Sequence, residues 1–74
     1  MTDDEIIAPG RLTFPNGGQI DVDSLYNGQV CFRRWMPGAD EPDWLRTPIA
    51  QFVMLVREQG GKRASLPPRA AGAG

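Results

Sequence analysis

Apolar and polar residues alternate in several short stretches of this chain, and a period of two is typical of β-strands with one buried face. The segment 26–35 shows the pattern best. Val30 and Phe32 fall on one side of the extended chain. Arg33 and Trp35 fall on the other side. The pattern therefore predicts a central strand with an apolar inner face and an outer face that carries arginine and tryptophan.

Two earlier segments, 11–14 and 19–23, alternate in the same way and are separated by strong turn residues. The first turn is Pro-Asn-Gly-Gly at 15–18, where glycine tolerates the positive φ that other residues avoid. Tyr-Asn-Gly at 26–28 supplies the second turn. Short turns of this kind join antiparallel neighbours, so we expect the three segments to form a meander.

The length of the second turn decides which side chains share a face. A two-residue Asn-Gly loop would place Val22 opposite Arg33 and mix apolar with charged side chains. A three-residue Tyr-Asn-Gly loop instead pairs Val22 with Phe32. It also pairs Ser24 with Val30. We favour the three-residue loop because it collects the apolar side chains on one face.

An odd loop length in the first hairpin likewise predicts two inner-face pairs: Phe14 with Ile20 and Leu12 with Val22. On the outer face Asp21 is then expected opposite Arg33. Asp23 is expected opposite both Arg11 and Cys31. Ion pairs of this kind contribute only about 0.2 to 1 kcal/mol each, so they order a surface more than they stabilise a fold.

Apolar residues return at helical spacing later in the chain, at Ile49, Phe52, Val53 and Val56. Thr47 is predicted to cap this helix and Pro48 to begin it, since proline at the first helical position loses no hydrogen bond that it needs. The two glycines at 60–61 are expected to end it near Gln59. One face of the helix should cover the inner side of the sheet.

The predicted fold class is α+β: a three-stranded antiparallel meander covered on one face by a single C-terminal helix. Residues 44–46, Trp-Leu-Arg, form either a fourth strand or an extended lead-in to the helix. With 74 residues the chain holds one domain, which we place at 10–60. Residues 1–9 are expected to form a flexible acidic arm that docks its isoleucines. Residues 61–74 are expected to be a disordered basic tail, because they contain too few apolar side chains to offset their ordering entropy.

Composition excludes most catalytic chemistry. The chain has no histidine and a single cysteine, so it lacks an imidazole base, a histidine-containing metal site and a thiolate cluster. Asp40, Glu41 and Asp43 form an acidic loop without the ligand spacing of a calcium loop. Cys31 has a nearby arginine but neither a base nor a resolving partner. We therefore expect no enzyme activity, no metal and no cofactor.

Charge and cysteine content limit the expected cellular compartment and the expected class of partner. A single cysteine forms no internal disulfide, which suits a reducing cytoplasm, and no secretory signal or membrane-spanning apolar run is present. A cytoplasmic protein without a membrane partner is expected. The net charge of -1 argues against a general nucleic-acid binder. Nucleic acid is expected at most as a secondary contact of the basic tail.

Binding to another protein is the function class that the pattern favours, because tryptophan and arginine are the most frequent interface anchors. Trp35 is expected to be exposed, whereas Trp44 suits the core and the surface equally. Arg34 falls on the inner face near the sheet end, where its stem covers the core and its head reaches water. The predicted partner-binding residues are Arg11, Arg33, Trp35, Asp40, Glu41, Asp43, Trp44 and Arg46.

The sequence Tyr-Asn-Gly-Gln-Val-Cys-Phe-Arg-Arg-Trp at 26–35, followed by a proline-containing acidic loop and the helix at Pro48, resembles a family of phage host-takeover proteins. These are the small RNA polymerase-binding transcription regulators of lytic Xanthomonas phages. The resemblance spans residues 10–60 and rests on length, organisation and the central strand. It implies binding near the amino-terminal part of the largest subunit of bacterial RNA polymerase. It further implies inhibition of initiation, through weakened sigma-factor engagement, and antitermination.

Two other functions are compatible with the sequence. The first is a small noncatalytic inhibitor or antitoxin-like module that binds a different host protein. The second is a single-stranded nucleic-acid-binding sheet, because Arg33, Arg34 and Trp35 resemble a base-stacking platform. Asp21 and Asp23 on the same surface would repel phosphate, so we rank the nucleic-acid hypothesis last.

Overall fold

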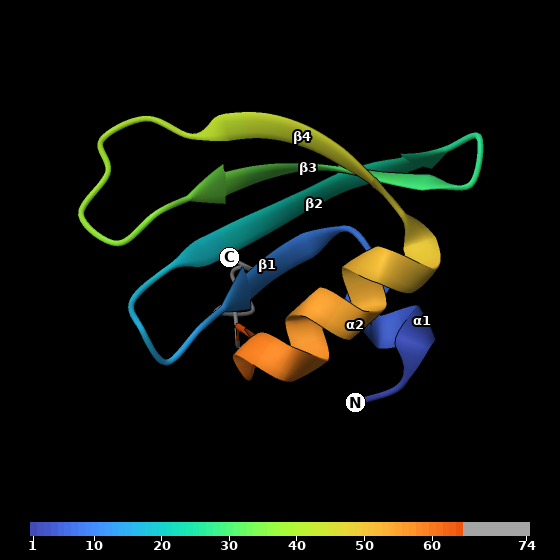
Figure 1. The fold of residues 1–74 in the computed structure, drawn as a ribbon, viewed down its shortest axis with the longest axis horizontal. Helices are drawn as coiled ribbons and strands as arrows, with labels where there is room; N and C mark the ends of the chain where they lie inside the picture. The colour runs from blue at the N-terminus through green and yellow to red at the C-terminus, as the bar shows by residue number, and fades with distance from the viewer. Residues whose placement is uncertain (65–74) are drawn as a thin grey trace, which may run out of the picture.

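The computed structural model describes residues 1–64 as a curved antiparallel sheet with α2 on its concave side and α1 beside α2 (Figure 1). The strands are β1 (Gly10–Thr13), β2 (Gln19–Tyr26), β3 (Gln29–Trp35), β4 (Asp43–Pro48) and β5 (Lys62–Arg63). The helices are α1 (Asp3–Ile7) and α2 (Ile49–Gln59). Their order across the sheet is β4-β3-β2-β1-β5. The predicted α+β class, an antiparallel meander covered on one face by a C-terminal helix, is confirmed.

The core lies between the concave side of the sheet and the apolar stripe of α2. It consists of Ile6, Leu12, Ile20, Val22, Val30, Phe32, Phe52, Val53 and Val56, all buried. The rings of Phe32 and Phe52 meet with their centroids 4.9 Å apart, which joins the central strand to the helix. The period of two in β2 and β3 therefore predicted the buried face of both strands correctly.

The second hairpin has a two-residue turn, Asn27 and Gly28, and not the three-residue loop that we favoured. Their φ angles of 52° and 74° are positive, as the hairpin turn that matches strand twist requires. Leu25 lies opposite Val30 in this register. The predicted pairing of Ser24 with Val30 is therefore wrong.

A bulge at Asp23 then corrects the register of the same hairpin. Ser24 lies opposite Cys31, and the next pair along the strand is Val22 with Phe32. Asp23 is the extra residue of the bulge, so the predicted pairing of Asp23 with Cys31 is wrong. The predicted pairing of Val22 with Phe32 is confirmed, because the bulge adds the residue that we had assigned to the turn.

The first hairpin has the predicted odd loop, closed by a 3.1 Å hydrogen bond from the Phe14 N–H to the Gly18 carbonyl. The observed pairs across it include Leu12 with Ile20 and Arg11 with Asp21. Each predicted pair is wrong by two residues: Phe14 with Ile20, Leu12 with Val22 and Arg11 with Asp23. A shift of two residues keeps every side chain on its face, so the predicted inner and outer residues stand.

Residues 44–46 belong to a fourth strand, β4, which pairs with β3. Thr47 is part of this strand and does not cap the helix; Pro48 takes the cap position without a side-chain hydrogen bond. The predicted helix end is confirmed, because Gly60 adopts the left-handed conformation and its N–H donates to the Arg57 carbonyl.

Within residues 1–64 no helix is both long and apolar enough to cross a membrane.

Both ends of the described chain are more ordered than predicted. The N-terminal segment contains the helix α1, which begins with a capping box: Thr2 and Glu5 exchange backbone-to-side-chain hydrogen bonds of 2.7 and 3.2 Å. Ile6 of this helix is fully buried, which agrees with the expected docking of the isoleucines. Lys62 and Arg63 form β5 beside β1, so the start of the predicted disordered tail is wrong. The rest of that tail lies outside the described residues.

The docking of α1 can be tested by truncating its buried side chain. Ile6→Ala should lower the free energy of unfolding by about 2 to 4 kcal/mol, because it opens a cavity in the core. Ile7→Ala is the matched control: Ile7 is half-buried, so a loss of about 1 kcal/mol is expected. Urea unfolding monitored by circular dichroism measures both values. Equal, small losses would show that α1 does not dock as described.

Candidate protein-binding surface

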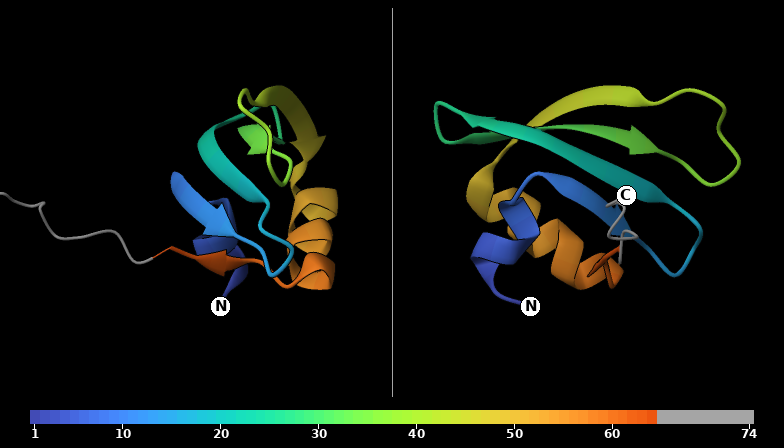
Figure 2. Two further views of the ribbon diagram at one scale, coloured as in Figure 1. Left: turned by 90° about the vertical axis from the view of Figure 1, so that its left-hand side faces the viewer. Right: turned by 180° about the vertical axis from the view of Figure 1, so that it is seen from behind.

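The outer face of the sheet is its convex face, which points away from α2 (Figure 2). Strand pairing places one continuous row of side chains across this face from β1 to β4. The row consists of Arg11, Asp21, Arg33 and Trp44. Side chains that lie directly opposite each other on paired strands are close enough to interact. The sheet therefore gathers residues that are far apart in the sequence.

Asp21 joins the two arginines of this row. Arg11 donates from Nε and from a terminal nitrogen to the two carboxylate oxygens, at 2.9 and 3.2 Å. A terminal nitrogen of Arg33 lies 3.6 Å from the same carboxylate. The hydrogen bond and the charge of Asp21 raise the pKa of Arg11 above its ordinary value. Because one carboxylate serves two guanidinium groups, the row keeps a positive charge.

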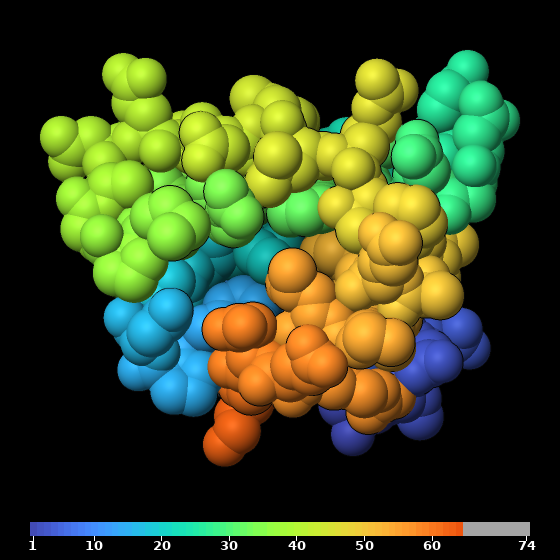
Figure 3. Space-filling model, in the orientation of Figure 1, coloured from blue at the N-terminus to red at the C-terminus, as the bar shows by residue number. Residues whose placement is uncertain are grey.

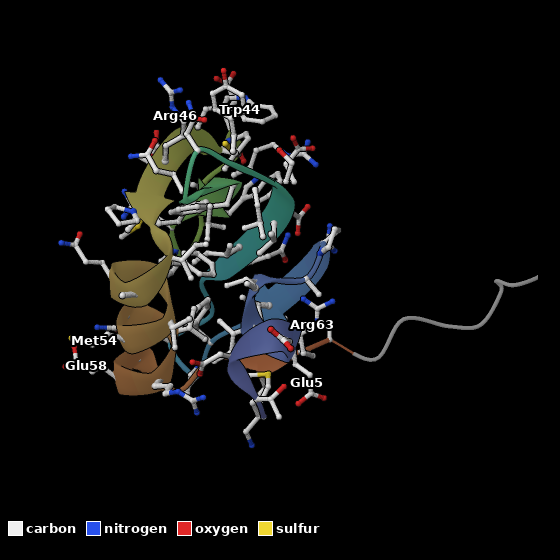
Figure 4. The ribbon with its side chains drawn as sticks, turned by 90° about the vertical axis from the view of Figure 1, so that its right-hand side faces the viewer. Glu5, Trp44, Arg46, Met54, Glu58 and Arg63 are labelled. Atoms are coloured by element: carbon white, nitrogen blue, oxygen red, sulfur yellow. The ribbon has the colours of Figure 1, made fainter. Side chains whose placement is uncertain are left out.

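Arg33 lies between two aromatic rings. Its guanidinium carbon is 5.4 Å from the ring centroid of Trp35 and 5.2 Å from that of Trp44. Each contact of this kind is worth about 0.5 to 1 kcal/mol at an exposed site. Trp44 is nevertheless 66% exposed, and Figure 4 shows Trp44 and Arg46 projecting together from the β4 end of the molecule. The stack is thus held in place and remains accessible.

We call this surface the outer patch and define it as Arg11, Asp21, Arg33, Trp35, Trp44 and Arg46. Apart from Asp21, all of these were predicted as binding residues, and the structure brings them onto one face. Trp44 lies on the surface and not in the core. Trp35 is half-buried, so its predicted exposure is wrong. Arg46 makes no ion pair with any residue from 1 to 64.

The acidic residues of the predicted site lie elsewhere. Asp43 pairs with Arg34 on the inner face, at 3.5 Å, and Arg34 stands at the sheet end as expected. Asp40 and Glu41 are exposed in the loop between β3 and β4. The acidic loop is therefore not part of the outer patch, because the alternation along β4 turns Asp43 to the side opposite Trp44.

Asp21 is the patch residue that we did not predict as part of the site. Its position opposite Arg33 was predicted, and that pairing is confirmed. Its contact with Arg11 depended on the two-residue shift in the first hairpin, which the alternation does not determine. A carboxylate between two predicted arginines was the available signal.

The surroundings of the patch contain little chemistry. Among residues 1–64 no group of three or more histidine, cysteine, aspartate or glutamate side chains is placed to hold a metal ion. Cys31 is half-buried on the outer face, opposite Ser24 on one side and Arg46 on the other. Neither neighbour supplies the general base that activates a thiol. The patch is suited to binding through charge and aromatic contact.

The role of Asp21 in holding the patch is testable with a substitution that removes its charge and keeps its shape. Asp21→Asn should lower the free energy of unfolding by about 1 kcal/mol, because it removes two partly exposed ion pairs. The control Asp23→Asn changes the same group at the bulge, where no arginine contact exists in the described chain, and should stay within about 0.5 kcal/mol. Urea unfolding followed by tryptophan emission measures both. Identical values for the two variants would contradict the bridging role.

Comparison of the chain with protein-family models, with curated proteins and with solved structures found no match.

Proposed function

We propose that this chain is a noncatalytic binding module that docks on a larger protein through the outer patch. The observation that carries the proposal is the Arg33 side chain held between Trp35 and Trp44 on the convex face of the sheet. Both helices lie on the other side of the sheet, so no helix of residues 1–64 covers this face. The exposed ring of Trp44 and the half-buried ring of Trp35 are thereby left open to a partner.

The arrangement of the patch favours tight contact. Tryptophan and arginine account for a large share of binding energy at protein interfaces, usually through a few residues near the centre. Long side chains lose conformational entropy when a partner immobilises them. Arg33 is already restrained by Asp21 and by two rings, so less of that entropy remains to be lost. The patch is therefore already partly ordered in the free chain, which lowers the entropy cost of binding.

The charge of the patch indicates which surface chemistry its partner should have. Its three arginines face one aspartate, which leaves a net charge of +2. Arg46 contributes a guanidinium group that has no ion-pair partner within the described chain. A complementary surface is acidic and carries an apolar or aromatic group that packs against Trp44. The partner we propose is therefore a protein with an acidic, partly apolar surface.

Bacterial RNA polymerase is our first candidate for this partner, and it comes from the resemblance of residues 10–60 to phage transcription regulators. On this proposal the chain acts in the bacterial cytoplasm and occupies the amino-terminal part of the largest subunit. Binding alone then impairs sigma-factor engagement and promotes antitermination. A bound protein shifts a conformational equilibrium of its partner when its affinities for the two conformations differ. No active site is required. An inhibitor or antitoxin-like module for another host protein is the second candidate, supported by the same patch.

The proposal is tested by disrupting the patch at its centre. Arg33→Glu combined with Trp44→Ala should weaken binding to purified bacterial RNA polymerase at least about tenfold, as expected when interface anchors are lost. Biolayer interferometry with the immobilised chain measures the change. The thermal midpoint should fall by only a few degrees, because Trp44 is 66% exposed and Arg33 lies outside the core.

The matched control carries the same changes away from the patch. Lys62→Glu combined with Met54→Ala produces an equal change of charge and removes another exposed apolar side chain, on β5 and α2. This variant should bind as the unaltered chain does. Absence of polymerase binding by the unaltered chain would exclude the first candidate. Binding to single-stranded DNA that falls steeply with salt would replace the protein-docking proposal with the nucleic-acid hypothesis.

A further inference from the structure

A recess that we call the side cleft lies on the helix side of the sheet, away from the row of the outer patch. It has a volume of about 250 Å³ and opens between the second half of α2 and the sheet end where β3 leaves. Figure 3 shows it as a hollow between the helix, in orange, and the segment after β3, in green. The side chains that decide its chemistry are Phe14, Ile20, Arg34, Met36, Leu55 and Gln59.

Apolar side chains at this cleft remain open to solvent. Met36 and Leu55 line it and are 50% and 39% exposed, whereas α2 buries Phe52, Val53 and Val56 in the core. Leu55 therefore lies beside the cleft and not within the core cluster. An exposed leucine and methionine at the mouth of a recess offer apolar area that a ligand can cover.

Arg34 gives the side cleft a positive charge that is poorly satisfied. Its Nε, like that of Arg33, is buried and has no hydrogen-bond partner among residues 1–64. Its ion pair with Asp43 is long, at 3.5 Å, and the two side chains are 40% and 61% exposed. Arg11 in the outer patch, by contrast, donates two hydrogen bonds to one carboxylate. Because the Arg34 side chain is 40% exposed and its ion pair is long, the guanidinium group retains the capacity to bind an anion that approaches through the cleft.

The volume of the cleft selects the kind of occupant. Sites for cofactors and other small molecules usually measure about 300 to 1,000 Å³, so this cleft is too small for a nucleotide or a similar ligand. One large apolar side chain fits. Because the wall carries a cation, the atoms next to that side chain should include a carboxylate.

We infer that the side cleft is an anchor site for a peptide segment of a partner protein. A leucine- or phenylalanine-sized side chain enters between Leu55 and Ile20, and a neighbouring carboxylate of the same segment pairs with Arg34. The site shares Trp35 with the outer patch but uses none of the row from Arg11 to Trp44. It is therefore a second contact point, which functions whether or not the outer patch binds RNA polymerase.

Two small probes that differ only in charge test the inference. N-acetylphenylalanine carries the benzyl group and the carboxylate, and its amide carries the benzyl group alone. In a ¹⁵N nuclear magnetic resonance titration of the whole chain, both should shift the amide signals of Gly18, Gln19 and Gln59. The acid should bind about fivefold more tightly than the amide, as expected for one partly exposed ion pair. Arg34→Met should remove this preference.

Matched variants separate the cleft from the rest of the surface. Arg46→Met removes an arginine from the outer patch and should keep the preference for the acid. Leu55→Ala should weaken both probes, whereas Met54→Ala, at the neighbouring exposed position of α2, should weaken neither. Shifts centred on Trp44, or a preference for the acid that survives Arg34→Met, would overturn the inference. The outer-patch variant Arg33→Glu with Trp44→Ala should bind both probes unchanged, so the two proposals fail independently.

Discussion

One extra residue, Asp23, determines which side chains share a face in this sheet. The two-residue turn at the tip of the second hairpin, continued without interruption, would place Val22 opposite Arg33 and mix core with surface. The bulge shifts the register by one residue, and Val22 meets Phe32 instead. The same shift places Asp21 opposite Arg33. The core and the outer patch therefore depend on the same local departure from regular pairing.

Alternation in the sequence predicts this arrangement because side-chain direction in a strand depends on parity alone. Parity does not determine a shift of two residues, so the partner of Arg11 was predicted wrongly while its face was right. The helix α1 had a readable signal in the Thr2 and Glu5 capping box, which a short acidic segment obscured. β5 had no readable signal, since it is held by its pairing with β1 and by hydrogen bonds from Arg63 to the carbonyls of Ala8 and Pro9. Contacts across so much chain leave no local pattern.

The free energies of these interactions indicate that different residues determine folding and binding. Fully burying a large apolar side chain is worth about 1.5 to 3 kcal/mol, and the core of residues 1–64 contains nine buried apolar residues. Each ion pair or cation–π contact of the outer patch contributes about 1 kcal/mol or less. The core therefore determines whether the chain folds, and the patch adds little to that balance. Substitutions at Arg33 or Trp44 are therefore expected to change binding without unfolding the domain.

The hydrogen bonds of Arg63 have a consequence for the order of folding. They join positions that are 54 and 55 residues apart, and the 2.6 Å ion pair between Arg57 and Asp3 spans 54. Closing a loop of that length carries an entropy cost that the hairpins of the meander avoid. We expect the three-strand meander to form first and α1 and β5 to join it last. By the same reasoning α1 and β5 detach first, so hydrogen exchange begins at β5 and at the side of β1 that it covers, while β3 stays protected.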